Sequence, residues 1–256
     1  MTEQEIEKKH AAIFEALRKE IARLNQVLET NEFSSENPQH VATHQLALRL
    51  IEFSTGCHML AKAGLAAANA ATGRTCLEVG FKLKAICKSM SAADIYNKQE
   101  DMDRLAKLKP ILSNQEMRAY FSEEDLKSWD NEILEIESEL NKTKTDASKN
   151  HASVRAKKSR KRASHDKKTV YSWAVDAGEE EVYRFAYSIF SDFTHSGPGS
   201  MKHICNVSSK GQFFMQTGPS DHMVDQVIGS VSHCLASASN AIEGLFAQVE
   251  KNQCAK

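Results

Sequence analysis

The chain has 256 residues and a formal net charge of −1, with only 4 Pro, 11 Gly and 7% aromatic residues, a composition that favours helices. Its N-terminus is charged and has no apolar signal core, and no uncharged apolar run approaches the roughly 18 residues of a membrane span. The six cysteines are scattered and form no Cys-x-x-Cys pair. From these features we expect a cytoplasmic protein with reduced thiols that is neither exported by a standard signal nor anchored in a membrane.

The apolar pattern predicts helices along most of the chain. Residues 2–29 carry apolar side chains at spacings of 3 and 4, and Asn37 followed by Pro38 marks the start of a second helix. A third helix, residues 73–90, is apolar around much of its circumference and is therefore expected at the centre of the fold. Further helices are expected over residues 94–109, ended by Pro110; 122–140, begun by a capping box at Ser122; 170–178; 179–195; and 220–249.

One segment follows a different pattern. Residues 203–218 favour a small β-hairpin with its turn near Lys210 and Gly211. Because the chain has no internal repeat and no sign of a second compact domain, we expect an all-α fold in which residues 1–256 form a single domain. The expected architecture is an up-and-down bundle of about six to seven helices.

The charges are unevenly distributed. Residues 142–168 contain eleven Lys and Arg against two Asp, a net charge of +9, so the remainder of the chain carries −10. This segment has almost no apolar residues, which indicates a basic, flexible insertion or a frayed helical extension. Its positive charge suits contact with a nucleic-acid backbone, and a solvated loop explains it equally well. The residues expected to contact nucleic acid are Lys157, Lys158, Arg160, Lys161 and Arg162.

Two of the expected helices carry unbroken apolar seams of the coiled-coil kind. The seam in residues 220–249 must close the bundle or join two copies of the chain, and the seam in residues 122–140 offers a second surface for self-association. A homo-oligomer is therefore one expectation. The first seam consists of Val224, Ile228, Val231, Leu235, Ala238, Ile242, Leu245 and Val249, and the second of Leu126, Trp129, Ile133, Ile136 and Leu140.

Residues 182–199 are the most informative stretch, a helix that ends near a histidine and is cut off by Gly-Pro-Gly. Its apolar residues recur at helical spacing and are expected to face the core, and its polar residues lie on the neighbouring arc. His195 falls in the last turn, where the negative end of the helix dipole favours imidazolium, so its charge can change near neutral pH. The apolar set is Val182, Phe185, Ile189 and Phe193, and the polar set is Ser188, Ser191, Asp192 and His195.

The central helix supplies Arg74 and Glu78, one turn apart on the same face. Beside so much apolar surface they are expected to be partly buried and therefore paired. Together with the polar end of residues 182–199 they suggest a site in which a histidine is acid or base, an arginine binds phosphate or an oxyanion, and carboxylates orient both. An ordinary ion pair plus a helix-terminal histidine is the plainer interpretation. The candidate catalytic residues are His195, Arg74, Glu78, Asp192 and Ser191.

Metal ligands occur only in fragments. His40 and His44 share a helix face, but the glutamate of the HExxH motif is absent and no third ligand is apparent. Asp192 and His195 resemble half of the carboxylate and histidine pair of di-metal bundles, and no second copy of the pair occurs. No glycine-rich phosphate loop of the P-loop or dinucleotide-binding kind is present. We therefore expect no metal and no cofactor.

Two motifs together resemble the mainly prokaryotic family called domain of unknown function 5677. The first is Arg74-Thr-Cys-Leu-Glu78 ahead of an apolar helix, and the second is Tyr183-x-x-x-Tyr187-Ser-x-x-Ser191-x-x-x-His195 before a turn. The resemblance spans residues 41–203, with the basic segment as an insertion. It implies an all-helical fold and strengthens the site hypothesis, and it brings no known reaction.

A more distant similarity is to the HEPN superfamily of helical-bundle ribonucleases and their inactive relatives, common in toxin and phage-defence systems. Their signature places an arginine shortly before a histidine on one helix, and here Ser188, Ile189 and Phe190 occupy those positions. Arg74 on a facing helix would have to replace that arginine. We therefore expect a protein that acts on RNA or binds phosphate, with a role in stress or phage defence. If it is an enzyme, we expect a metal-independent RNase-like hydrolase. The alternative is a non-catalytic interaction protein in which the Arg, Glu and His residues form a structural clamp.

Overall fold

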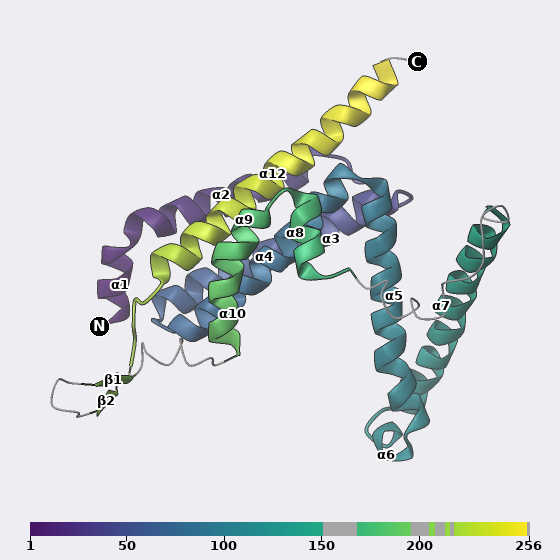
Figure 1. Ribbon diagram of the computed structural model, residues 1–256, viewed down its shortest axis with the longest axis horizontal. Helices are drawn as coiled ribbons and strands as arrows, with labels where there is room; N and C mark the ends of the chain where they lie inside the picture. Colours follow the sequence, from purple (N-terminus) through teal and green to yellow (C-terminus); the bar gives the residue numbers. More distant parts are fainter. Residues whose placement is uncertain (151–167, 196–204, 208–212, 216–217, 255–256) are drawn as a thin grey trace. The chain divides into compact units, whose positions relative to one another are not determined.

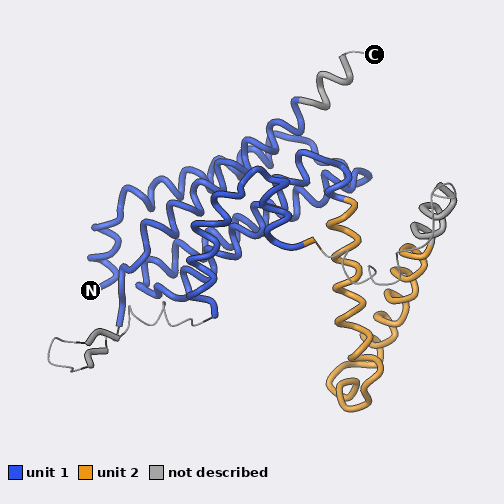
Figure 2. Tube along the Cα trace, in the orientation of Figure 1, with its two compact units in different colours: residues 1–93, 169–256 blue, residues 94–168 orange. Residues whose placement is uncertain are grey.

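The computed structural model describes residues 1–150, 168–195, 205–207, 213–215 and 218–254 (Figure 1). The chain divides into two compact units, of which unit 1 comprises residues 1–93 and 169–256 and unit 2 comprises residues 94–168 (Figure 2). The predicted basic insertion belongs to unit 2. The all-α class is confirmed, and the prediction of a single domain stays a prediction.

Unit 1 is a helical bundle to which distant parts of the chain contribute (Figure 1). None of the described helices is long and apolar enough to cross a membrane, and the cytoplasmic location stays a prediction. The described helices that lie wholly in unit 1 are α1 (Glu3–Lys9), α2 (Ala11–Thr30), α3 (Pro38–Lys62), α4 (Ala66–Lys88), α8 (Val170–Ala177), α9 (Glu180–Val182), the π-helix η1 (Tyr183–Tyr187), α10 (Ser188–Thr194) and α12 (Val224–Cys254).

Local sequence signals set several helix ends. The Asn37 side chain accepts hydrogen bonds from the backbone N–H groups of Gln39 and His40, and Pro38 is the first residue of α3, as predicted. Gly178 ends α8 with φ 72°, a left-handed conformation that favours glycine. The boundary between α8 and the helical stretch that follows is therefore fixed by one residue.

Helix α4 lies at the centre of unit 1, as predicted, because α3, α8, α10 and α12 all pack against it. Glycines permit the closest approaches. A Cβ atom at Gly80 would lie 2.0 Å from Cys234 Sγ of α12, and one at Gly73 would lie 2.6 Å from Val227 Cγ1. Both distances are far below van der Waals contact, so these positions exclude any larger side chain unless α12 shifts.

Helix α12 uses its apolar seam to close the bundle. Every predicted seam residue from Val224 to Leu245 is at most 6% exposed, and Val249 has a side chain outside the described set. The helix packs on α2, α3 and α4. The described part of this seam is therefore occupied within the chain and does not join two copies.

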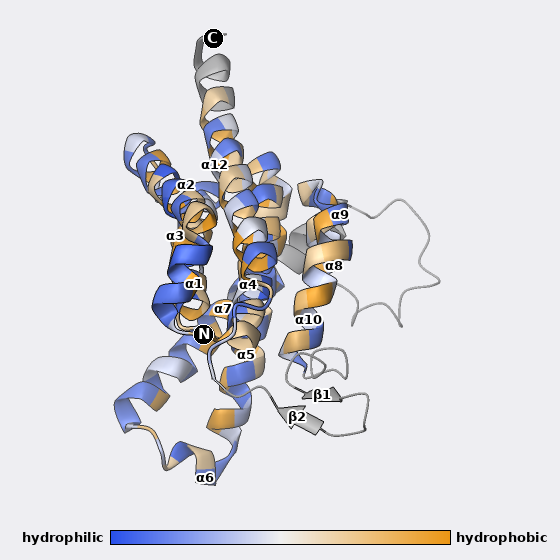
Figure 3. Ribbon diagram, turned by 90° about the vertical axis from the view of Figure 1, so that its left-hand side faces the viewer, coloured by the Kyte–Doolittle hydropathy of each residue, from blue (hydrophilic) through white to orange (hydrophobic). Residues whose placement is uncertain are grey.

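The predicted core stripe of residues 182–193 is wrong. Phe185 is 71% exposed and Ile189 is 49% exposed, whereas Tyr187 and Phe190 are buried. The reason is η1, because a π-helical turn holds more residues than an α-helical turn and so rotates the following face by one residue. Large apolar side chains of η1 and α10 are consequently exposed, and Figure 3 shows hydrophobic turns in α10.

Four of the six cysteines are buried free thiols, as predicted: Cys57, Cys76, Cys87 and Cys234. Burial raises the pKa of Cys87 to about 12 and raises that of Cys234 well above its usual range. Since the thiolate is the reactive form, these residues behave as small core side chains and not as nucleophiles.

Unit 2 is built on α5 (Met90–Ser113), α6 (Gln115–Arg118) and α7 (Glu123–Asn150), of which α5 begins in unit 1. The sequence predicts the end of α5 at Pro110, and this prediction is wrong: the helix continues to Ser113, because a proline in the last turn removes few backbone hydrogen bonds. Arg104 of α5 pairs with Glu132 of α7 through contacts of 2.7 and 3.0 Å, and Lys109 pairs with Glu137.

The predicted β-hairpin is present. Strands β1 (Cys205–Val207) and β2 (Phe213–Met215) pair antiparallel, with Cys205 opposite Met215. The predicted turn at Lys210 and Gly211 lies outside the described residues.

Replacing Gly80 tests the contact between α4 and α12. Gly80→Ala forces a methyl group into Cys234 and is expected to lower the free energy of unfolding by about 1–3 kcal/mol. The matched control is Gly56→Ala in α3, where a Cβ meets only Thr72 at 3.8 Å, so that the helix gains about 0.5–1 kcal/mol. Urea denaturation measures the free energy of unfolding of both variants. Adding Cys234→Ala to Gly80→Ala should recover part of the lost stability, because it removes the Sγ atom that the new methyl group meets. Equal stability of the two alanine variants would contradict the close packing.

Candidate functional site

The structure brings together the two motifs that the sequence singled out. Arg74 on α4 and His195 at the C-terminal end of α10 are separated by 121 residues, yet Arg74 Nη1 lies 3.2 Å from His195 Nε2. His195 is exposed, and the Arg74 side chain is 20% exposed. The contact therefore lies at the edge of the core, where a solute can reach it.

The rest of the guanidinium is held by two further groups. Nε lies 3.2 Å from Glu78 Oε1 as an ion pair within α4, and Nη2 donates a 2.7 Å hydrogen bond to the hydroxyl of Tyr187. The guanidinium carbon also lies 4.9 Å from the centre of the Tyr187 ring, a cation–π contact. Arg74 and Glu78 are thus partly buried and paired, as predicted, and only Nη1 faces His195.

Tyr187 is the member of the site that the sequence analysis missed. It belongs to η1, is 6% exposed, accepts from Arg74 and donates a 2.7 Å hydrogen bond to Glu78 Oε1. Its ring stacks on Tyr183 at 4.8 Å. Burial, reinforced by the Glu78 carboxylate, raises the pKa of Tyr187 to about 12. A π-helical turn, often found at functional sites, is the structural signal that marks it.

We call Arg74, Glu78, Tyr187 and His195 the Arg74 cluster. Among the described residues, the Ser191 and Asp192 side chains make no hydrogen bond or ion pair with this cluster, and Asp192 is exposed. Ser191 contributes a backbone carbonyl that accepts from the His195 N–H. The predicted nucleic-acid contacts lie outside the described residues: Lys157, Lys158, Arg160, Lys161 and Arg162.

The geometry defines what the cluster can do chemically. A guanidinium only donates hydrogen bonds, so its contact with His195 requires an Nε2 that carries no proton. When a bound anionic group draws Nη1 to itself, the lone pair of Nε2 becomes available to accept a proton, and the guanidinium holds the anion beside it. His195, as an acid–base group, and Arg74, as an anion-binding group, therefore lie side by side at the surface.

No described group of His, Cys, Asp and Glu side chains has the arrangement of a metal site. His40, one of the two histidines considered as ligands, is buried against Phe246, and its backbone-facing Nδ1 accepts from the Ser34 N–H. Burial lowers the pKa of His40. It is therefore a residue of the core.

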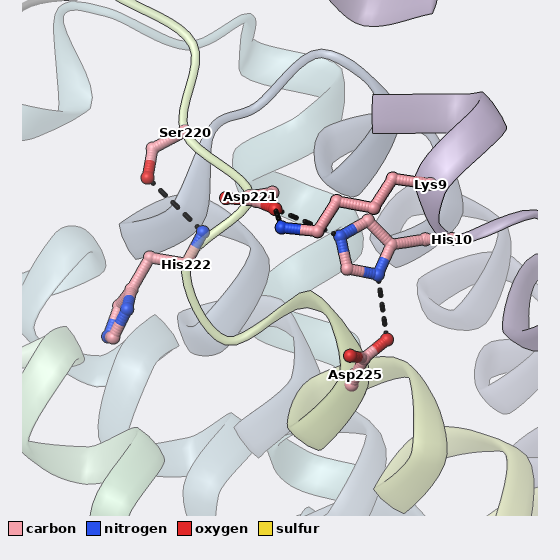
Figure 4. A network of polar contacts seen from close by, with 6 residues as sticks. All are labelled: Lys9, His10, Ser220, Asp221, His222 and Asp225. Atoms are coloured by element: carbon pink, nitrogen blue, oxygen red, sulfur yellow. Dashed lines mark hydrogen bonds and ion pairs between the residues drawn. The ribbon is translucent and has the colours of Figure 1, made fainter. Parts of the chain in front are cut away.

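A second polar network joins the N-terminus to the segment before α12 (Figure 4). His10 is 7% exposed, with Nδ1 2.7 Å from Asp225 Oδ1 and Nε2 3.1 Å from Asp221 Oδ2. Lys9 also pairs with Asp221, and the hydrogen bonds from Lys9 and His10 lower the pKa of that carboxyl group. Because both ring nitrogens are occupied and the ring is buried, this histidine fastens the α1–α2 junction to the start of α12.

Fold and cluster together define a helical-bundle protein with a polar site at the end of a helix. A family model described as "Family of unknown function (DUF5677)" matches residues 40–213, more than half of the chain. The chain belongs to this family, and all members of the Arg74 cluster lie within the matched residues. A search of curated proteins and a search of solved structures each found no match.

The pH dependence of stability tests the bonding of Tyr187. The folded pKa of about 12 exceeds the usual value of 10, so the folded state holds the phenol proton more tightly than the unfolded state. This stabilisation is complete below about pH 10 and is lost as the pH rises to about 12. We expect urea unfolding of Tyr187→Phe to show a shallower loss of stability in this window than wild type. Tyr120→Phe, at a residue 81% exposed, is the control and should keep the wild-type slope. The same slope in Tyr187→Phe would contradict the assignment.

Proposed function

We propose that the Arg74 cluster binds a phosphate-bearing ligand and, with RNA as substrate, acts as a metal-independent hydrolase. The observation that carries this proposal is the 3.2 Å contact of Arg74 Nη1 with the exposed His195 Nε2. It supports a site where one phosphate group meets both a fixed positive charge and an acid–base group.

Each residue then has a defined task. His195 Nε2 takes the proton of the 2′-hydroxyl, whose oxygen bonds to the adjacent phosphorus as the bond to the 5′ oxygen breaks and that oxygen gains a proton from water. Arg74 stabilises the charge that develops on the phosphate oxygens. Glu78 and Tyr187 do not touch the substrate in this scheme; they hold the guanidinium in place.

An HEPN-like interpretation gains support from the position of Arg74. In the helix that ends at His195, Ser188, Ile189 and Phe190 occupy the positions where such proteins have an arginine. Arg74, from helix α4, contacts the histidine instead. Contact of RNA with the basic residues 157–162 and a role in stress or phage defence stay predictions.

A second candidate is the non-catalytic clamp. The Arg74 and Glu78 side chains are only 20% and 26% exposed and share the buried hydroxyl of Tyr187, which suits a structural bridge between α4 and η1. In that case the cluster stabilises the fold, and the contact with His195 is incidental. The two candidates differ in the effect of removing the exposed histidine.

The deciding experiment incubates labelled RNA with the protein in EDTA. We expect wild type to cleave and His195→Ala to lose about 10²–10⁴-fold in rate, the usual contribution of an acid–base group. Because His195 is exposed, its removal should change the free energy of unfolding by less than about 0.5 kcal/mol. Arg74→Lys should lower cleavage as well, since lysine cannot keep the same set of directed contacts.

Two control variants make the result interpretable. His233→Ala removes a histidine that is 58% exposed, and Arg49→Lys changes an exposed arginine that pairs with Glu52 one turn away on α3. Both should retain wild-type cleavage. A loss of several kcal/mol of stability in His195→Ala, or the absence of cleavage and of phosphate binding in folded wild type, would favour the clamp.

A further inference from the structure

The imidazole ring of His195 is held by a single contact. Among the described residues, Arg74 is the only one whose side chain is joined to the ring by a hydrogen bond or an ion pair, through the 3.2 Å contact of Nη1 with Nε2. The carboxylate of Asp192 makes no such bond to it, and His195 is exposed at the C-terminal end of α10. The ring can therefore leave Arg74 by changing its rotamer, without a shift of the helix.

Arg74, by contrast, is fixed in place. Glu78 and Tyr187 hold its Nε and Nη2, so that the positive charge stays where it is when the histidine moves. Nη1 is the nitrogen beside the exposed ring, and it is the one that a ligand from solvent meets first. An anion that accepts the hydrogen bond of Nη1 therefore displaces the imidazole from it.

This displacement changes the chemistry of the ring. A guanidinium only donates hydrogen bonds, so its contact with His195 exists only while Nε2 carries no proton. With an anion between the two groups the sign of the interaction reverses, because an imidazolium donates a charge-assisted hydrogen bond to the anion. Binding of an anion therefore favours uptake of a proton, and by linkage the proton favours the anion to the same extent.

The charges around the ring favour a ligand with two negative charges. In the free protein Arg74 and Glu78 form a neutral pair, and Tyr187, with its pKa raised to about 12, is neutral as well. The exposed Asp192 and the C-terminal end of α10 both stabilise a positive ring. A protonated ring adds a second cationic group beside the guanidinium. The charged or titratable groups on the described elements around the ring are Arg74 and Glu78 of α4, Tyr187 of η1, Asp192 of α10 and, beyond Phe193, His222 ahead of α12.

We infer that the Arg74 cluster binds a phosphate group with two negative charges, that of a phosphomonoester, together with one proton that His195 Nε2 takes up from water. The bound group then accepts hydrogen bonds from Arg74 Nη1 and from the imidazolium. The inference rests on the proposed function, because it concerns the ligand and the pH dependence of the same site. The contact between Arg74 and His195 is then the resting state of the site, and an anion opens it.

Isothermal titration calorimetry of the full chain with sulfate tests the coupling to a proton. Sulfate keeps both of its charges over the range in which histidine side chains titrate, about pH 5 to 8. The dissociation constant of sulfate for wild type should rise with pH in this range, by up to about tenfold for each pH unit, because one proton is taken up. Titrations at about pH 7 in two buffers of different ionisation enthalpy should show the same uptake directly, as a fraction of one proton per sulfate.

The deciding variant is His195→Gln, because glutamine is polar but takes up no proton. It should bind sulfate with one affinity at every pH in this range and without proton uptake. The matched control is His233→Gln, at a histidine that is 58% exposed and lies 3.8 Å from Glu179, and it should keep the wild-type pH dependence. Circular dichroism verifies the helicity of both variants. Proton uptake that persists in His195→Gln would overturn the inference.

A matched pair of ligands tests the number of charges. At about pH 7 a nucleoside 3′-monophosphate carries close to two negative charges, and its methyl ester carries one. Wild type should bind the monophosphate about tenfold more tightly or better, because only this ligand gives both Arg74 and the protonated His195 a charge to face. The preference should shrink in His195→Gln. Equal affinities of the two ligands for wild type would contradict a doubly charged ligand.

The outcomes distinguish this inference from the proposed function. If wild type binds sulfate equally well at all pH values, without proton uptake, the inference is overturned and a phosphate-binding site remains. If folded wild type binds neither sulfate nor the two nucleotides at any pH, the inference and the proposed phosphate site are overturned together, and the clamp is favoured.

Discussion

The close packing of helices around α4 is the constraint on which unit 1 depends. Gly73 and Gly80 leave two positions of α4 without a side chain, so that α10 and α12 can approach its backbone there. At the edge of the same helix, Arg74 and Glu78 are too deeply placed to remain without partners, because an unpaired charge at such a position is strongly unfavourable. The close packing around α4 thus leaves Arg74 and Glu78 partly buried, and their side chains pair with Tyr187 and His195.

Much of the fold follows from short-range signals in the sequence. The cap at Asn37, the stop at Gly178 and the seam of α12 each depend on neighbouring residues, and the structure has all three where the sequence predicts them. The face of residues 182–193 could not be predicted in this way. The π-helical turn has no distinctive composition, and it exists because tertiary packing favours Tyr187 and Phe190 in the core.

The candidate site shows the same division. The ion pair of Arg74 with Glu78 follows from their spacing of four residues on one helix. The contact of Arg74 with His195 depends on how α10 lies on α4, and no local pattern contains that information. The three-residue spacing predicts Asp192 as the partner of the histidine, yet Asp192 is exposed, and the buried Tyr187 holds Arg74 and Glu78 together.

The extra residue of η1 decides which side chains of this helix face the core. In a regular α-helix the sequence pattern would bury Phe185 and Ile189, and Tyr187 and Phe190, which are buried in the structure, would turn outward. The apolar area in the core would change little, but Tyr187 would turn away from Arg74 and Glu78. One inserted residue therefore separates a bundle that has the Arg74 cluster from a bundle of similar core that lacks it.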